Sequence, residues 1–219
     1  MQGGNYGKRE REKVIQAAIE CSDKKLIHGT SGNVSIACRE EGVMVITPSG
    51  IPYEEITPDM VPVIDLATGE WTEGKCKPST EAPMHRLIFL NKVKMEAVVH
   101  THSPFATAMS ILVEELPAVA AASAPYSPVK VAPFEIPGSQ EIAEAAVKAM
   151  GDHNVVCLLE NHGLIAAGRN VSQAMSIAEY VEENSQIAYY TYVAGKMKPL
   201  PESGYKIMHD RAVKKLGLE

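Results

Sequence analysis

The sequence predicts an α/β fold: a single domain with a mixed, largely antiparallel central sheet that helices cover on both sides. Apolar runs of strand length and segments with helical periodicity alternate irregularly along the 219 residues. Several of the predicted strands follow one another across a short turn, which favours hairpins over a regular doubly wound sheet. Because no repeat, low-complexity tract or long linker divides the chain, residues 1–219 are predicted to form one domain.

The first half of the chain is predicted to be a helix followed by short strands and two further helices. Residues 9–26 carry their apolar side chains on one stripe at helical spacing, as in an amphipathic helix. The next helix has Ser79 and Thr80 as candidate caps and Pro83 in its first turn. After the first helix, the predicted elements are strands at 34–37, 43–47 and 61–66, a helix at 81–91, a strand at 97–101 and a helix at 104–112.

The second half is predicted to contain the longest helix. Residues 119–133 are rich in Ala and Pro, and we expect short strands linked by loops there. The longest helical pattern ends at Gly195, a residue type that commonly terminates helices. The remaining predicted elements are a helix at 139–150, strands at 155–159 and 164–167, and helices at 172–194 and 205–216.

The composition limits the classes of function. Hydrophobic residues make up 45% of the chain and charged residues 22%, close to a globular average. No stretch approaches the roughly 20 apolar residues of a membrane-spanning helix, and residues 1–13 carry no apolar signal-peptide core. We therefore expect a cytoplasmic protein without a membrane partner. The net charge of -6 argues against a nucleic-acid partner, because such partners require clustered Lys and Arg, but it permits a small phosphorylated substrate.

A pair of histidines is the most informative short motif. His100 and His102 lie at the end of a β-rich run, and residues two apart on a strand point to the same face. Two imidazoles presented in this way can bind one zinc ion. The motif alone is weak evidence, because ordinary surface or core histidines more often account for such a pair.

Two other segments strengthen the metal hypothesis. His162 lies three residues after the buried run 155–159, at a strand end where sites commonly form. Glu81 lies at the start of a predicted helix, where backbone N–H groups are free. Three histidines and one glutamate complete a tetrahedral zinc site, or leave one position exchangeable for substrate. The spacing in the sequence does not show that these segments meet.

Five separated motifs occur in order between residues 9 and 195. They are Gly29–Ser35, Thr47–Gly50, Ser79–Glu81, His100-x-His102 and Asn161–Leu164. Their succession resembles the class II aldolase/adducin family, and the branch that it resembles most is that of the L-fuculose-phosphate aldolases. Five motifs in order are far more specific than any one of them.

The resemblance implies a metal centre and a phosphate pocket. His100, His102 and His162 match the zinc-binding histidines of the family, and Glu81 matches a glutamate that binds the resting metal and acts as the base. The implied cofactor is one Zn²⁺ per chain, or another divalent metal. The implied phosphate pocket consists of Thr30, Gly32, Asn33, Ser49, Gly50, Ser79 and Thr80.

The chemistry of these pocket residues agrees with that implication. Glycines let the backbone approach an anion closely, while hydroxyl and amide side chains add neutral donors. The segments match neither a Walker A motif nor a dinucleotide-binding fingerprint. Without the neighbouring motifs they would be interpreted as ordinary turns.

The resemblance further implies an aldehyde-lyase reaction. A zinc-dependent aldolase would cleave a ketose 1-phosphate similar to L-fuculose 1-phosphate into dihydroxyacetone phosphate and a small aldehyde, through a metal-stabilised enediolate. In this branch a mid-chain tyrosine and a C-terminal tyrosine assist as proton donors. Alanines and Leu216 occupy the corresponding places here, so Tyr126, a few residues beyond the first, is the candidate donor. A homotetramer with active sites near subunit interfaces is also implied.

Other functions remain open at this point. Enzymes on the same scaffold include 4-epimerases, sugar-phosphate dehydratases and aldolases for other 5-deoxy or methylthio ketose phosphates. In the epimerases, the position that corresponds to Glu81 resembles an aspartate. The glutamate in this chain therefore favours aldol chemistry. A non-catalytic, adducin-like interaction module is a different class, and the intact set of four candidate ligands argues against it.

Overall fold

The computed structural model describes residues 7–219 and contains one central sheet. Its strands are β1 (Asn33–Cys38), β2 (Val43–Ile46), β3 (Val63–Asp65), β4 (Trp71–Glu73), β5 (Ala97–Thr101), β6 (Glu115–Leu116), β7 (Val129–Ala132), β8 (Val156–Leu159) and β9 (Gly163–Gly168). They are ordered β4-β3-β2-β1-β5-β9-β8-β7-β6. Every neighbouring pair is antiparallel except β7 and β8, which are parallel. The predicted mixed, largely antiparallel sheet is confirmed.

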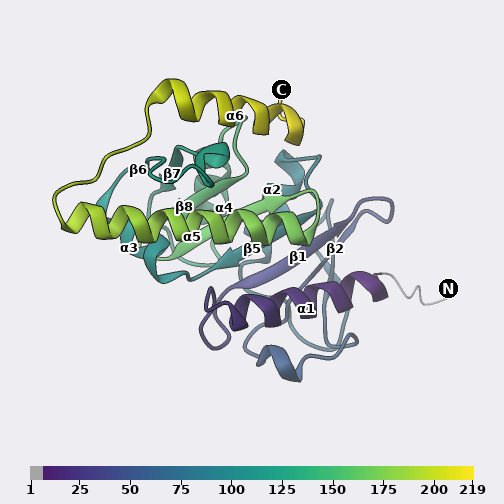
Figure 1. The fold of residues 1–219 in the computed structure, drawn as a ribbon. Coiled ribbons are helices and arrows are strands. Elements are labelled where there is room, and N and C mark those ends of the chain that lie inside the picture. The colour runs from purple at the N-terminus through teal and green to yellow at the C-terminus, as the bar shows by residue number, and fades with distance from the viewer. Residues whose placement is uncertain (1–6) are drawn as a thin grey trace.

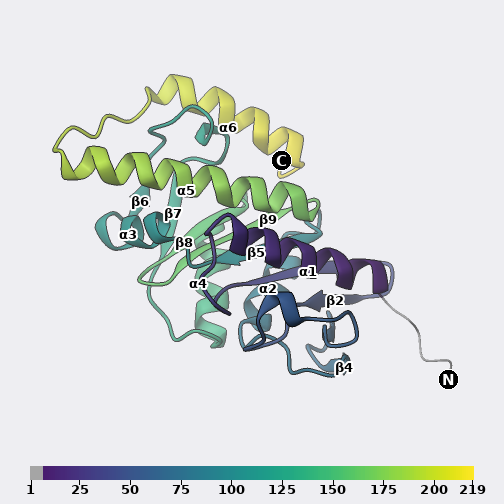
Figure 2. The same cartoon turned by 60° about the horizontal axis from the view of Figure 1, so that its bottom comes forward.

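Helices cover both faces of this sheet. They are α1 (Lys8–Asp23), α2 (Ala82–Asn91), α3 (Pro104–Leu112), α4 (Gln140–Met150), α5 (Val171–Val193) and α6 (Glu202–Leu216), with short 3-10 turns η1 (Tyr53–Glu55) and η2 (Ala124–Tyr126). Figures 1 and 2 show α1 and α5 on one face of the sheet and α2 and α4 on the other. The last helix, α6, lies over η2 at one side of the molecule (Figure 1). Among the described residues, no helix combines the length and apolar character needed to cross a membrane.

The central strand β5 explains why both faces must be covered. Its side chains point alternately to the two faces, and all five of its residues are buried. Val99 belongs to the same apolar cluster as Val14 of α1, whereas Val98 belongs to the cluster that contains Phe89 of α2. Removing apolar side chains from water on both sides stabilises the sheet and holds the ends of β5 in fixed positions.

Several boundaries differ from the predicted ones. Helix α1 ends at Asp23 rather than at residue 26, because Lys25 adopts a positive φ of 60° and the chain reverses. The amide of Leu26 donates to the Cys21 carbonyl, so Leu26 packs back against the helix end and mimics a continuing apolar stripe. The two short strands β4 and β6 were not predicted, and residues 119–133 contain the single strand β7 and the turn η2.

Two predicted helix starts have different outcomes in the structure. Helix α4 begins after Ser139, whose hydroxyl accepts a hydrogen bond from the Ile142 amide at 3.3 Å, as expected of a cap. Helix α2 begins at Ala82 with Glu81 in the cap position, so Ser79 and Thr80 do not cap it. The Ser79 hydroxyl instead accepts from the Glu81 amide at 3.2 Å and fixes the backbone before the helix.

Gly163 provides a test of the packing between β5 and β9. A Cβ atom at this position would lie 2.1 Å from the carbonyl oxygen of Thr101 and 3.2 Å from Cα of His102. We expect Gly163→Ala to lower the free energy of unfolding by about 1–3 kcal/mol, because the two strands must separate. Urea unfolding measures the change. Gly204→Ala is the matched control, since a Cβ there meets nothing within 4 Å. Equal unfolding midpoints for the two variants would contradict the prediction.

Candidate metal centre and phosphate pocket

Four segments that are distant in the sequence meet at one edge of the sheet. In the register of the sheet, His100 of β5 lies between Asn33 of β1 and Ile165 of β9. His162 precedes β9 by one residue, and Glu81 immediately precedes α2. The turn before β9 is held by Asn161, a non-glycine residue with a φ of 58°, a conformation that Asn tolerates better than most residues. The predicted ligands His100, His102, His162 and Glu81 are therefore brought together.

The distances within this cluster fit a single small cation. The candidate ligand atoms all lie within 4.8 Å of one another. Nε2 of His100 lies 3.1 Å from Nε2 of His102 and 3.3 Å from Oε2 of Glu81, and Nε2 of His162 lies 3.4 Å from Oε1 of Glu81. Ligand atoms at about 2.0–2.1 Å from a tetrahedral zinc are separated by about 3.3 Å, so the observed spacings match.

The three imidazoles are neutral, and their lone pairs are available for a metal. The pKa values of His100, His102 and His162 are each lowered to about 4, mainly by burial, and the neighbouring His100 contributes to the shift of the other two. The Nδ1 atom of His100 lies 2.8 Å from the Leu164 carbonyl and donates its hydrogen there. Its Nε2 consequently carries the lone pair that faces the cluster.

The buried position of Glu81 also favours a cation. Glu81 is buried, and its Oε1 atom has no hydrogen-bond partner among the described residues. The histidines beside it supply no positive charge, because they are neutral. A buried and unpaired carboxylate is costly, and a divalent cation between the Glu81 oxygens and the imidazoles removes that cost. The residues present therefore fit a divalent metal ion.

A buried hydrogen-bond chain holds the other oxygen of Glu81. Nδ2 of Asn33 donates to Oε2 of Glu81 at 2.8 Å, and Oδ1 of Asn33 pairs with Nε2 of His85. Nδ1 of His85 pairs with the hydroxyl of Ser35 at 2.6 Å. His85 was not identified as a site residue from the sequence, and its side chain is completely buried. Its position four residues after Glu81, on the same helix face, was the signal that could have identified it.

The predicted phosphate-pocket segments also adjoin one another. The Ser79 amide donates to the Thr47 carbonyl, and the Ser49 amide donates to the Lys77 carbonyl. The Val34 amide donates to the Thr47 hydroxyl, which joins these two segments to β1. Ser79 and Asn33 are buried, whereas Thr30, Ser49, Gly50 and Thr80 are exposed on the surrounding loops. Their binding of phosphate remains a prediction.

Gly32 brings the glycine-rich loop directly against the metal-site strand. It has a φ of 84°, and a Cβ atom there would lie 2.7 Å from the His100 carbonyl. The hydroxyl of Tyr53, which sequence reasoning missed, donates to the carbonyls of Ser31 at 3.0 Å and Gly32 at 2.9 Å. Tyr53 therefore fixes the loop backbone from behind.

Tyr126 lies apart from these contacts. It forms the end of η2, packs at the border of the apolar core and faces the region covered by α6. Burial raises the pKa of its phenol, with a smaller contribution from Tyr180. None of the hydrogen bonds among residues 7–219 joins its side chain to Glu81 or the three histidines. Its role as a proton donor remains a prediction.

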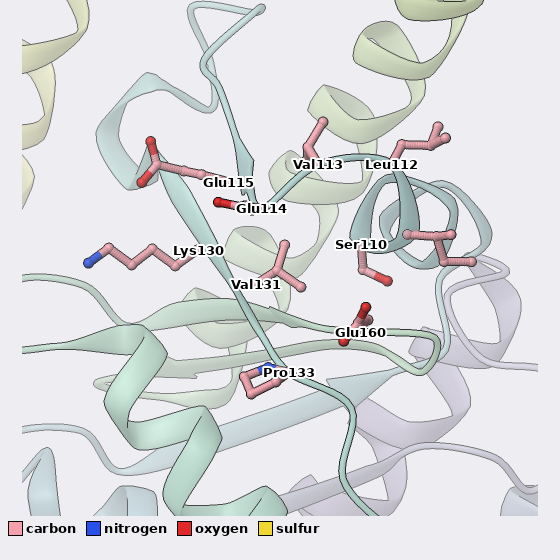
Figure 3. A pocket seen from close by; sticks show the side chains of 10 residues that line it. Ser110, Leu112, Val113, Glu114, Glu115, Lys130, Val131, Pro133 and Glu160 are labelled. Atoms are coloured by element: carbon pink, nitrogen blue, oxygen red, sulfur yellow. The ribbon is translucent and has the colours of Figure 1, made fainter.

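A separate open pocket of about 580 Å³ lies behind the turn that carries His162. Figure 3 shows its lining side chains, which include Glu114, Lys130 and Glu160. The hydroxyl of Ser110, on its wall, accepts from the Asn161 amide at 3.2 Å. No predicted site residue lines this pocket, so its connection with the metal centre is limited to supporting the turn.

Comparisons with known proteins agree with this geometry. The family described as Class II Aldolase and Adducin N-terminal domain matches residues 12–189. The 5-deoxy-D-ribulose 1-phosphate aldolase of Bacillus thuringiensis serovar kurstaki is 42% identical over 195 residues, covering 89% of this chain and 91% of that protein. The L-fuculose phosphate aldolase of Escherichia coli K12 is 36% identical over 184 residues, 83% of each chain.

Solved structures lead to the same conclusion. A structure of L-fuculose 1-phosphate aldolase superimposes with a TM-score of 0.87 at 33% identity, covering 92% of this chain and 94% of that one. The family match spans most of the chain, and the similar proteins are aldolases over nearly their full lengths. The chain belongs to the class II aldolase and adducin family and is a class II aldolase, a metal-dependent lyase.

Proposed function

We propose that this protein is a zinc-dependent aldolase that cleaves a ketose 1-phosphate into dihydroxyacetone phosphate and a small aldehyde. The observation that supports it best is the buried Glu81 carboxylate beside three neutral imidazoles whose nitrogen atoms converge. His100, His102, His162 and Glu81 would hold one divalent cation per chain. That cation, when bound, supplies a Lewis acid that polarises the substrate carbonyl and stabilises negative charge next to it.

Glu81 is suited to move a proton at the substrate carbon C3. Cleavage of the C3–C4 bond leaves an electron pair on C3, and a proton must be added there to give dihydroxyacetone phosphate. Asn33 holds Oε2 of Glu81, while Oε1 has no hydrogen-bond donor. A carboxylate with one fixed and one free oxygen can exchange a proton with a carbon held close to it.

The loops next to the metal centre are proposed to bind the phosphate group. Backbone N–H groups and the side chains of Ser49, Ser79 and Thr80 would provide neutral donors without a fixed positive charge. The start of α2 contributes the positive end of its dipole. A phosphate bound here would place the sugar carbons toward Glu81, because Ser79 lies only two residues before Glu81. The C4 hydroxyl must lose its proton when the aldehyde forms and regain it in the reverse reaction. This second proton transfer is assigned to Tyr126.

The relatives suggest two classes of ketose. One is the 6-deoxyhexulose class, represented by the L-fuculose phosphate aldolase of E. coli. The other is the 5-deoxypentulose class, represented by the B. thuringiensis protein and by the 5-methylthioribulose-1-phosphate/5-deoxyribulose-1-phosphate aldolase of Rhodospirillum rubrum, 35% identical over 175 residues. The B. thuringiensis relative has the higher identity to this chain. A 5-deoxypentulose 1-phosphate is therefore a candidate substrate beside the L-fuculose 1-phosphate type.

The homotetramer implied by the resemblance is part of the same proposal. Apolar side chains are exposed on neighbouring helices, including Ile111 of α3 and Tyr190 and Val193 of α5. Helices α3 and α5 pack against each other, so these side chains are candidates for subunit contacts.

Glu81→Gln tests the proton transfer. Glutamine keeps the shape of the side chain but cannot exchange a proton with C3, so we expect turnover to fall by roughly 100-fold or more. Release of dihydroxyacetone phosphate, coupled to its reduction, measures the rate. Bound metal should persist through the three histidines and is measured in the same samples. Unchanged turnover would exclude the assigned role.

Removal of one histidine tests the metal centre. We expect the wild-type protein to bind about one zinc ion per chain. The variant His100→Ala removes a fully buried ligand and should lose most of that metal after dialysis. Elemental analysis measures the content, and His153→Ala, at an exposed histidine, is the control. Equal metal content in all three proteins would contradict the proposed centre.

A panel of ketose 1-phosphates tests the substrate class. A 5-deoxypentulose 1-phosphate should yield acetaldehyde and dihydroxyacetone phosphate, and a 6-deoxyhexulose 1-phosphate should yield lactaldehyde and the same phosphate. We expect cleavage of at least one of them, with kcat/KM ranking the two. Consumption without dihydroxyacetone phosphate would indicate a 4-epimerase or a dehydratase. Metal-free protein without turnover would favour a non-catalytic module.

A further inference from the structure

The geometry points to His85 as a positioning residue that sets the orientation of Glu81 through the amide of Asn33. This inference rests on the proposed function and concerns the same site. His85 touches neither Glu81 nor the three histidines by a hydrogen bond, and it is completely buried. Its effect on the reaction must therefore pass through Asn33.

The hydrogen bonds of this chain have one consistent direction. Nδ2 of Asn33 donates to the Glu81 carboxylate, so Oδ1 faces His85 and can only accept. Nε2 of His85 must then carry a hydrogen. Burial holds the pKa of His85 well below its usual value, so the imidazole is neutral and its Nδ1 accepts from the Ser35 hydroxyl. Each donor in the sequence Ser35, His85, Asn33 is matched to one acceptor.

His85 selects one of two orientations of the Asn33 amide. In the rotated amide, Oδ1 would face the carboxylate of Glu81 and Nδ2 would face the N–H of His85. The first contact would join two acceptors, and the second would join two donors as long as the imidazole keeps its hydrogen on Nε2. Water cannot relieve them, because the side chains of Ser35, His85 and Asn33 are buried. The imidazole thereby keeps the Nδ2–H group of Asn33 directed at Oε2 of Glu81.

The hydrogen bonds from His85 through Asn33 to Glu81 form a closed ring, because the backbone at the start of α2 joins Glu81 to His85. Glu81 precedes the first residue of α2, and His85 lies one turn further along the same helix. Asn33 and Ser35 lie two residues apart on β1 and point to the same side of the strand. The ring therefore joins one helix turn to one strand through Asn33. It leaves Oε1 of Glu81 as the carboxylate oxygen without a donor.

Asn33 is consequently more than a phosphate-pocket residue. Its carbonyl oxygen and one amide hydrogen are already used by His85 and Glu81. Only one amide hydrogen is left for a substrate. His85 is the better residue to test, because its replacement leaves the phosphate loops and all four candidate metal ligands unchanged.

The test compares His85→Phe with His85→Gln at saturating zinc. Phenylalanine fills a similar volume without a donor, whereas glutamine carries an N–H at a similar distance along the side chain. The first readout is exchange of the C3 hydrogen of dihydroxyacetone phosphate with D₂O, followed by NMR. This partial reaction reports the Glu81 proton step without any aldehyde. The second readout is kcat and KM for cleavage, and the third is the thermal midpoint.

We expect His85→Phe to lower the exchange rate and kcat by roughly 10- to 100-fold, the usual range for residues that support a metal site. KM should change less than about threefold, because the phosphate loops are intact, and His85→Gln should recover most of both rates. His153→Phe, at an exposed histidine, should behave as the wild type. Ser35→Ala, which removes the donor to Nδ1, should give a smaller loss than His85→Phe.

Three results would overturn the inference. They are wild-type exchange in His85→Phe, an equal loss in His85→Gln and His85→Phe, and a loss that follows KM or the thermal midpoint instead of kcat. The first of these results, combined with a loss seen only below saturating zinc, would assign His85 to metal retention and not to orientation of Glu81. Absence of exchange in the wild-type protein would instead refute the proposed function, so the two failures are distinguishable.

Discussion

The buried negative charge of Glu81 is the constraint on which the rest of the site depends. A carboxylate in this position is tolerated only when its surroundings supply donors or a cation. Asn33 supplies one donor, and the three neutral histidines, whose nitrogen atoms converge beside the carboxylate, supply no positive charge. The strands β1, β5 and β9 and the start of α2 must keep their register for this balance to hold, and the apolar packing on both faces of the sheet maintains that register.

Much of this arrangement could be predicted from the sequence because its signals are local. His100 and His102 alternate on a strand, and Glu81 marks a helix start, so both patterns are visible within a few residues. The mixed sheet followed from the order of short apolar runs. Family resemblance then joined the separate motifs, and the structure brought the four candidate ligands to within 4.8 Å of one another.

The features that could not be predicted depend on contacts between distant segments. His85 shows its function only when α2 is placed against β1, and Tyr53 only when η1 is placed under the glycine-rich loop. The strands β4 and β6 contain three and two residues, too few to show an alternating pattern. Leu26 extended the apparent first helix because tertiary packing, and not helical periodicity, requires an apolar residue there.

The single parallel strand pair in the sheet places residues 133–139, which follow β7, beside the candidate site. Because β7 and β8 run in the same direction, the segments that leave their carboxyl ends start side by side. The Phe134 amide donates to Glu160, and Gly138 lies so close to the Thr80 carbonyl that a Cβ would be 2.9 Å from it. Residues 133–139 thus touch both the turn before His162 and the proposed phosphate loop through backbone atoms. The side chains of Phe134 and Ile136 are exposed, so substitutions there can change this wall while the backbone contacts and the candidate metal ligands stay in place.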